Sequence, residues 1–230
     1  MFYINTIFTP DAINVFTDAS IKKLRSGETI GCAGSIAVFG EPKTRNEQER
    51  YQIIRNTTSN NSEIKAIRLG IEQILPYKNY YKKIRLFSDS QLSIFGIRDR
   101  ILNWKFYNGK FIGSNGAPII NQDIFSEIVH TILENDLYIE FYHQKGHVGF
   151  TDKSLNNAMH VFTVSNNIRT YVDMLFIKQI TVYNDMVDNN SRQKLENICR
   201  LHNRQYIEPL IFEPDIFDKS RYRELTRYNN

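Results

Sequence analysis

The sequence contains little cysteine and no long hydrophobic run. Its two cysteines, Cys32 and Cys199, lie far apart in apolar surroundings, and neither belongs to a closely spaced pair. We therefore expect reduced core residues rather than a disulfide or a zinc site. No stretch of roughly 18 apolar residues is present, and residues 1–5 show no basic segment leading into an apolar one, which predicts neither a membrane span nor a signal peptide. We expect an intracellular protein of the cytoplasm, nucleoid or nucleus, a class that includes viral proteins acting in a host cell.

The apolar content of the chain is sufficient for a folded domain. Of its 230 residues, 41% are hydrophobic, which allows a buried core in one domain with room for an appendage. Lys and Arg number 29 against 25 Asp and Glu, giving a net charge of +4. This slight basic excess permits a polyanionic partner such as nucleic acid without requiring one.

Three acidic residues occupy positions from which their side chains can reach a shared crevice. Asp89 ends the apolar run 84–87, Asp18 ends the run 13–17, and Glu63 begins an amphipathic helix. Each acid alone has a structural explanation, because Asp-Ser is a good helix cap and the helix dipole favours Glu in a first turn. Carboxylates at strand ends usually point into a ligand-binding crevice, so three acids from three elements together predict a metal site.

The hydrophobic pattern predicts strands and helices in a mixed order. Strands are expected at about 13–18, 32–39, 51–57, 84–89 and 137–142, and helices at about 63–75, 91–101, 122–134 and 153–164. This order favours an α/β domain with a mixed sheet. Between the last strand and the last helix lies Lys145-Gly146-His147-Val148-Gly149, a glycine-flanked histidine in a loop, which suits a mobile proton carrier.

These motifs, taken in order, resemble those of type 1 ribonuclease H. The resemblance rests on Phe16-Thr17-Asp18-Ala19-Ser20, Glu63, Phe87-Ser88-Asp89-Ser90-Gln91 and the His147 loop, with 45 and 26 residues between successive acids. It covers residues 13–164. It implies the RNase H-like fold, a mixed five-stranded sheet flanked by helices. We accordingly expect a nuclease domain over residues 1–164 and a smaller C-terminal extension over 165–230 with no assigned role.

The resemblance also implies an activity, endonucleolytic hydrolysis of the RNA strand of RNA–DNA hybrids. The family uses two Mg²⁺ ions, with Mn²⁺ as a substitute, and hard cations of this kind require oxygen ligands. By family position Asp18 would bridge both ions, and Glu63 and Asp89 would each help to hold one. His147 would assist proton transfer or product departure. No protein partner is implied.

One position departs from the family pattern. The family places a fourth acid ten residues after the loop histidine, and this chain has Asn157 there. Asp152 lies five residues too early and is a poor substitute. Asn157 as a metal-site residue would lower metal affinity and slow turnover. Two explanations remain open: a deliberate Asp-to-Asn substitution that traps substrate, or a natural protein that binds hybrids without cutting them.

Nucleic-acid contacts are also predicted by family position. Asn60 and Gln91 are candidates for the minor groove and its 2′-hydroxyls, whereas Asn61 is displaced by one residue from the family position. Trp104 lies in a basic aromatic segment suited to stacking and phosphate contact, although a core position is the alternative. The complete predicted set is Ser20, Ser59, Asn60, Gln91, Trp104, Lys105 and Lys145.

Two further alternatives complete the predictions. A DNA-cutting relative on the same fold, such as an integrase or junction resolvase, is disfavoured by the glycine-flanked His147 and by the Thr- and Asn-rich approach to Glu63. In the extension, residues 171–183 have ambiguous periodicity, and Ser191 is a reasonable cap for a helix through about residue 204. The basic aromatic residues 221–228 suit a frayed end or a partner contact.

Overall fold

A mixed five-stranded sheet forms the centre of the protein, as predicted. The computed structural model describes residues 3–4, 6–24, 26–40, 46–81, 83–108 and 110–203. The strand order is β4-β3-β2-β5-β8, with β3 antiparallel to β2 and β4, and with β5 parallel to both β2 and β8. The strands are β2 (Ala12–Lys23), β3 (Thr29–Phe39), β4 (Asn46–Arg55), β5 (Lys83–Ser88) and β8 (Ile139–His143).

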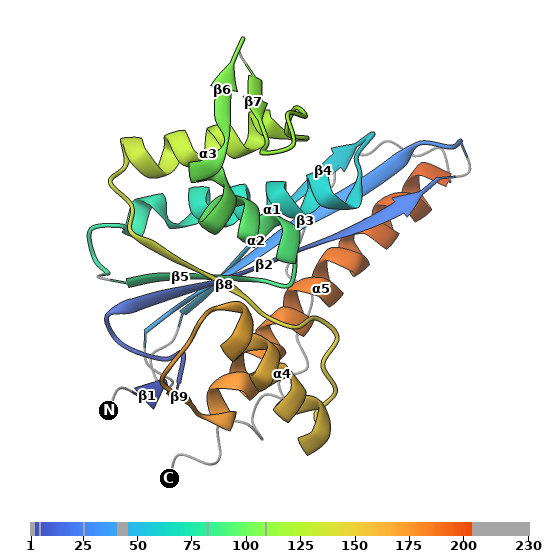
Figure 1. Ribbon diagram of the computed structural model, residues 1–230. Coiled ribbons are helices and arrows are strands. Elements are labelled where there is room, and N and C mark those ends of the chain that lie inside the picture. Colours follow the sequence, from blue (N-terminus) through green and yellow to red (C-terminus); the bar gives the residue numbers. More distant parts are fainter. Residues whose placement is uncertain are drawn as a thin grey trace.

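Helices cover both faces of this sheet. On one side lie α1 (Ser59–Ile74), α2 (Gln91–Phe95) and α3 (Gln122–Glu134), and on the other lie α4 (Asp152–Ser165) and α5 (Met174–Asn203) (Figure 1). The alternation of side chains along β2 explains the two layers. Ile13 and Val15 pack with α1 and α3, whereas Phe16, the residue after Val15, packs toward α5.

The long helix α5 shares a core with the sheet. The Phe16 ring stacks between those of Phe87 and Tyr183, at centroid distances of 4.9 and 4.8 Å. Near the other end of α5, Leu195 and Cys199 pack with Cys32 of β3. Both cysteines are free and buried. The predicted extension therefore contains a helix that completes the hydrophobic core, and we propose that the nuclease domain continues through residue 203 rather than ending at 164.

Three local predictions differ from the structure. Helix α1 begins at Ser59 rather than Glu63, because the Thr58 side chain caps it by accepting a hydrogen bond from the Asn61 amide. Glu63 consequently lies in the second turn, where the helix dipole does not explain it. Ser191 lies inside α5 and caps nothing. The third strand, β4, begins at Asn46, five residues earlier than predicted.

The region after Asp89 is also less regular than predicted. The expected helix over residues 91–101 is α2 followed by a π-helical turn, Gly96–Arg100, and a 3₁₀ turn, Ile101–Asn103. A small hairpin, β6 (Lys105–Tyr107) and β7 (Lys110–Ile112), projects beyond α3 (Figure 1).

The remaining elements are short: β1 (Tyr3–Ile4), which pairs with β9 (Tyr171–Val172), and a 3₁₀ turn, Leu75–Tyr77. No helix in the described ranges is long and apolar enough to cross a membrane. Residues 221–228 lie outside the described residues.

Ile177→Ala tests whether α5 belongs to the domain. Ile177 is fully buried in the cluster that contains Phe16 and Phe87. Its truncation should reduce the free energy of unfolding by about 2–5 kcal/mol in a single transition. Urea denaturation followed by circular dichroism measures this loss, with Leu133→Ala, 70% exposed on α3, as the control. A stability equal to that of the control would show that α5 folds separately from the sheet.

Candidate metal centre

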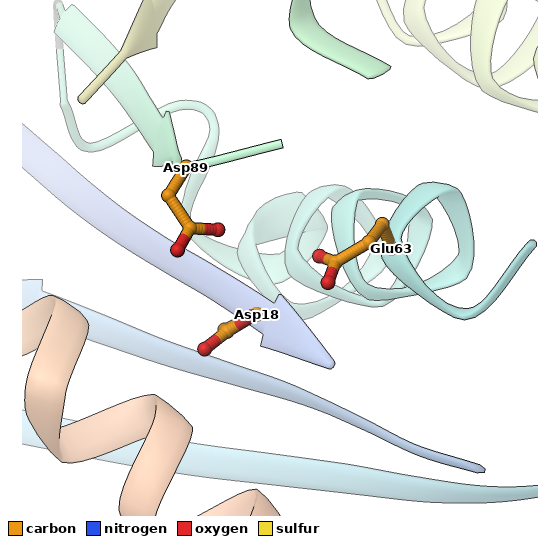
Figure 2. A group of neighbouring side chains, drawn as sticks. All are labelled: Asp18, Glu63 and Asp89. Atoms are coloured by element: carbon orange, nitrogen blue, oxygen red, sulfur yellow. The ribbon is translucent and has the colours of Figure 1, made fainter. Parts of the chain in front are cut away.

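Three predicted acids meet at one end of the sheet. Asp18 lies on β2, Asp89 directly follows β5, and Glu63 reaches toward both from α1 (Figure 2). The parallel register pairs Thr17 of β2 with Ser88 of β5, so Asp18 lies beside Asp89 where β5 ends, although β2 continues past the predicted end at Asp18 to Lys23. One carboxylate oxygen from each acid lies within 4.8 Å of the others. Residues far apart in the sequence therefore bring three carboxyl groups close together.

Burial and mutual repulsion perturb all three carboxyl groups. Burial, followed by the charges of Asp89 and Asp188, raises the pKa of Asp18 to about 8. Burial and the charge of Asp18 raise the pKa of Glu63 well above its usual range, and burial raises that of Asp89. The Ala19 amide donates a 2.7 Å hydrogen bond to Asp18, but Oε2 of Glu63 is buried and has no hydrogen-bond partner among the described residues. Such a set fits a divalent cation, which prefers carboxylate oxygens and would offset their repulsion.

The stability of the metal-free protein should fall as the pH rises. Because the pKa of Asp18 is raised from 3.8 to about 8, the folded state holds this proton more tightly than the unfolded state does. Below its pKa in the unfolded state, the Asp18 carboxyl is protonated in both states and does not reduce the stability. Above that pKa, the free energy of unfolding falls with rising pH until the pH passes the pKa of the folded state. We expect the free energy of unfolding in EDTA to decrease by on the order of 3 kcal/mol between about pH 5 and pH 8. Urea titrations across this range measure the decrease, and a profile that is flat or rises with pH would contradict it.

A fourth carboxylate that the sequence reasoning missed comes from α5. Asp188 raises the pKa of both Asp18 and Asp89 through its charge, and its side chain is only 14% exposed. One of its oxygens, Oδ2, pairs with Arg192 at 2.6 Å and lies 3.9 Å from Nδ1 of His147. Asp188 therefore lies within electrostatic reach of Asp18 and Asp89 and of the predicted loop histidine.

Asn157, the predicted fourth position, lies on a different helix. Its side chain is exposed on α4, which packs against β8 and α5, and no contact between Asn157 and the acids occurs within the described part of the chain. Helix α5 packs directly against β2 and β3 instead. Gly34, the residue paired with Asp18, lets α5 lie this close to the sheet. A Cβ at Gly34 would collide with the hydroxyl of Ser191 on α5.

The His147 loop packs directly on the acidic cluster. A Cβ at Gly146 would collide with the carboxylate of Asp89, so only glycine fits there without movement of the chain. His147 adopts a left-handed backbone conformation, with φ of 51°, and its side chain is 78% exposed. The histidine charge acts on Asp89 and lowers its pKa. The loop therefore holds a solvent-accessible imidazole beside the carboxylates.

The predicted nucleic-acid contacts occupy several elements around this centre. Ser20 follows Asp18 on β2, Ser59 and Asn60 begin α1, Gln91 begins α2, Lys145 lies in the His147 loop, and Lys105 is exposed on β6. Asn61, the displaced residue, donates a hydrogen bond to Asn121. Trp104 is half-buried and packs edge-on against Phe125, with 5.1 Å between the ring centroids. Its ring therefore packs against a hydrophobic core cluster, as the alternative prediction held.

Known proteins resemble this chain over the region that holds the first three acids. Residues 10–161 match the RNase H family model, a match that ends within α4 and does not include α5. A ribonuclease H of Clostridium botulinum is 28% identical over 156 residues, 65% of this chain and 97% of that protein. A ribonuclease H of Mannheimia succiniciproducens is 32% identical over 148 residues, 62% of this chain and 81% of that protein.

One solved structure resembles this chain in its fold. The foamy viral protease-reverse transcriptase in complex with RNA/DNA hybrid superposes with a TM-score of 0.50 and 14% identity. The matched region is 68% of this chain but only 20% of that much longer one. The likeness supports the fold of the sheet and its helices.

Proposed function

Since the chain belongs to the RNase H family, we propose that it cuts the RNA strand of RNA–DNA hybrids endonucleolytically with two divalent metal ions. The observation that carries the proposal is the cluster of Asp18, Glu63 and Asp89, whose oxygens lie within 4.8 Å of one another. Magnesium is the proposed metal, and manganese its substitute, because both favour oxygen ligands. When bound, the ions supply an activated water and stabilise the leaving oxygen.

The chain's own residues then have distinct proposed roles. By family position, Asp18 would contact both ions, while Glu63 and Asp89 would each help to hold one. Asp188 takes the fourth position, because its charge already acts on Asp18 and Asp89. His147, exposed beside Asp188, would accept or release a proton as the product leaves.

The proposed role of Asp188 changes the interpretation of Asn157. Attenuated turnover was predicted because the fourth acid was expected on the first helix after His147. With Asp188 on α5 supplying that charge, we propose that Asn157 does not limit the reaction. The alternative function, a non-catalytic protein that binds hybrids, depended on Asn157 and loses its main support.

Hybrid recognition is proposed for the residues that surround the carboxylates. Asn60 and Gln91 lie in the first turns of α1 and α2, and their side chains can hydrogen-bond the groove and the 2′-hydroxyls. Ser20, Ser59, Lys105 and Lys145 are the remaining candidates, with the two lysines suited to phosphates. Trp104 contributes mainly by supporting the β6–β7 hairpin.

The test is hydrolysis of an end-labelled RNA–DNA hybrid in magnesium and in manganese. Double-stranded DNA and double-stranded RNA of the same sequence serve as controls. Cutting confined to the RNA strand of the hybrid supports the proposal. Hybrid binding without cutting in either metal would favour the binding-module alternative, and cutting of double-stranded DNA would favour the integrase or resolvase class.

A further inference from the structure

A buried amide on α5 faces the same acids as Asp188. Asn184 precedes Asp188 by one helical turn, so both side chains lie on one face of α5. Asn184 is only 2% exposed, as is Gln144, the first residue after β8. A buried side-chain amide is costly unless its polar atoms find partners, so its contacts indicate why it is there.

The two amides form a hydrogen-bonded chain that ends on Asp89. Nε2 of Gln144 donates to Oδ1 of Asn184 at 2.6 Å, and hydrogen bonding by the Asn184 side chain lowers the pKa of Asp89. Because Oδ1 already accepts from Gln144, the amide nitrogen of Asn184 is the atom directed at the carboxylate. The backbone amide of Gln144 donates to the carbonyl of Ser88 at 3.0 Å, which fixes Gln144 beside the strand that carries Asp89.

This arrangement opposes the repulsion within the acidic cluster. Asp89 lies just beyond the end of β5, and rotation about its χ2 bond is intrinsically soft. The negative charge of Asp188 acts on Asp89, and the Asp18 and Glu63 carboxylates lie within 4.8 Å. On one side the backbone of Gly146 limits the movement of Asp89, since even a Cβ there would meet its carboxylate. A hydrogen bond from Asn184 supplies the second restraint.

We infer that Asn184, oriented by Gln144, is a positioning residue that fixes the Asp89 carboxylate for metal binding. The inference rests on the proposed function, because it assumes that Asp89 is a metal ligand. Partners that orient ligating carboxylates commonly change metal affinity by about 10–100-fold when they are removed. No contact of Asn184 with the substrate is required.

The experiment measures Mn²⁺ binding to the whole chain without nucleic acid, by electron paramagnetic resonance of free Mn²⁺. Asn184→Ala and Asn184→Leu should each weaken Mn²⁺ binding by about 10–100-fold, because neither variant can donate to Asp89. The matched control is Asn190→Ala, which removes an amide on the same helix that donates to Glu49 instead. Circular dichroism at the titration temperature verifies that each variant is folded, which separates loss of metal affinity from loss of stability.

A double-variant comparison tests the role of Gln144. Gln144→Ala should weaken Mn²⁺ binding less than Asn184→Ala, and adding it to Asn184→Ala should cause no further loss, because both act through one hydrogen bond. A folded Asn184→Ala protein that binds Mn²⁺ as tightly as the parent would overturn the inference while leaving the proposed function standing. A parent protein that binds no Mn²⁺ would overturn both.

Discussion

Asp18→Asn is expected to abolish metal-dependent cutting of the RNA strand. Asp18 is the most buried of the clustered acids, at 6% exposure, and the charges of both Asp89 and Asp188 act on it. Asparagine preserves the shape but removes the charge and places amide hydrogens where a cation would bind. Losing about 4 kcal/mol or more of stabilisation at the metal centre corresponds to about a 10³-fold or greater loss in rate. The end-labelled hybrid assay in magnesium measures this loss.

The control for this variant is Asp152→Asn. It removes the same charge from an exposed position at the start of α4, away from the acidic cluster, and should leave cutting unchanged. The Asp18→Asn protein should also lose part of the pH dependence of stability, since the raised pKa of Asp18 contributes to that dependence. Undiminished cutting by Asp18→Asn would refute the assignment of the metal centre.

The sheet and the first three acids could be predicted because local patterns determine them. Asp18 and Asp89 each follow an apolar run, and parallel pairing of these runs brings their ends together. The position of Glu63 could be predicted less well. The polar residues before it look like a linker. Thr58 caps the helix, however, which begins at Ser59, so Glu63 lies in its second turn.

Helix α5 was predicted only over its last part, from Ser191, because its buried face is not uniformly apolar. Among its buried side chains are Gln179, Thr181, Asn184 and Ser191, which interrupt the apolar periodicity that identifies an amphipathic helix. Ser191 therefore resembles a cap, although it is a mid-helix residue packed against Gly34. These polar residues have different partners, since Gln179 accepts a hydrogen bond from the Ile7 amide and Asn184 accepts one from Gln144. Of these residues, Asn184 is the one that the pKa of Asp89 links to the acidic cluster.

We propose Asp188 rather than Asn157 for the fourth position for a related reason. Counting from His147 assumes that the first helix after the loop crosses the sheet, but here α4 intervenes and packs at the edge beside β8. Counting ten residues from His147 reaches Asn157 on α4, and this count alone does not show that a second helix follows. An available signal was the pair Asn184 and Asp188, two polar residues that the helical period places one turn apart on one face.

Asp188→Asn and Asn157→Asp together decide where the fourth charge lies. If Asp188 completes the metal centre, its replacement should slow hybrid cleavage by about 10²–10³-fold, equivalent to about 3–4 kcal/mol of lost stabilisation. Asn157→Asp should have no such effect, because residue 157 is exposed on α4. Single-turnover cleavage at saturating magnesium, and again at limiting magnesium, separates a defect in metal binding from one in chemistry.

The two variants change charge in opposite directions, so a general electrostatic effect on hybrid binding would move them oppositely. Asp188→Asn also frees Arg192, which lies 2.6 Å from the carboxylate, and the added positive charge should strengthen hybrid binding while cleavage falls. Tighter binding with slower cutting is therefore the expected signature of a lost ligand. Faster cutting by Asn157→Asp with unchanged cutting by Asp188→Asn would instead place the fourth acid on α4 and restore the interpretation of this chain as an attenuated nuclease.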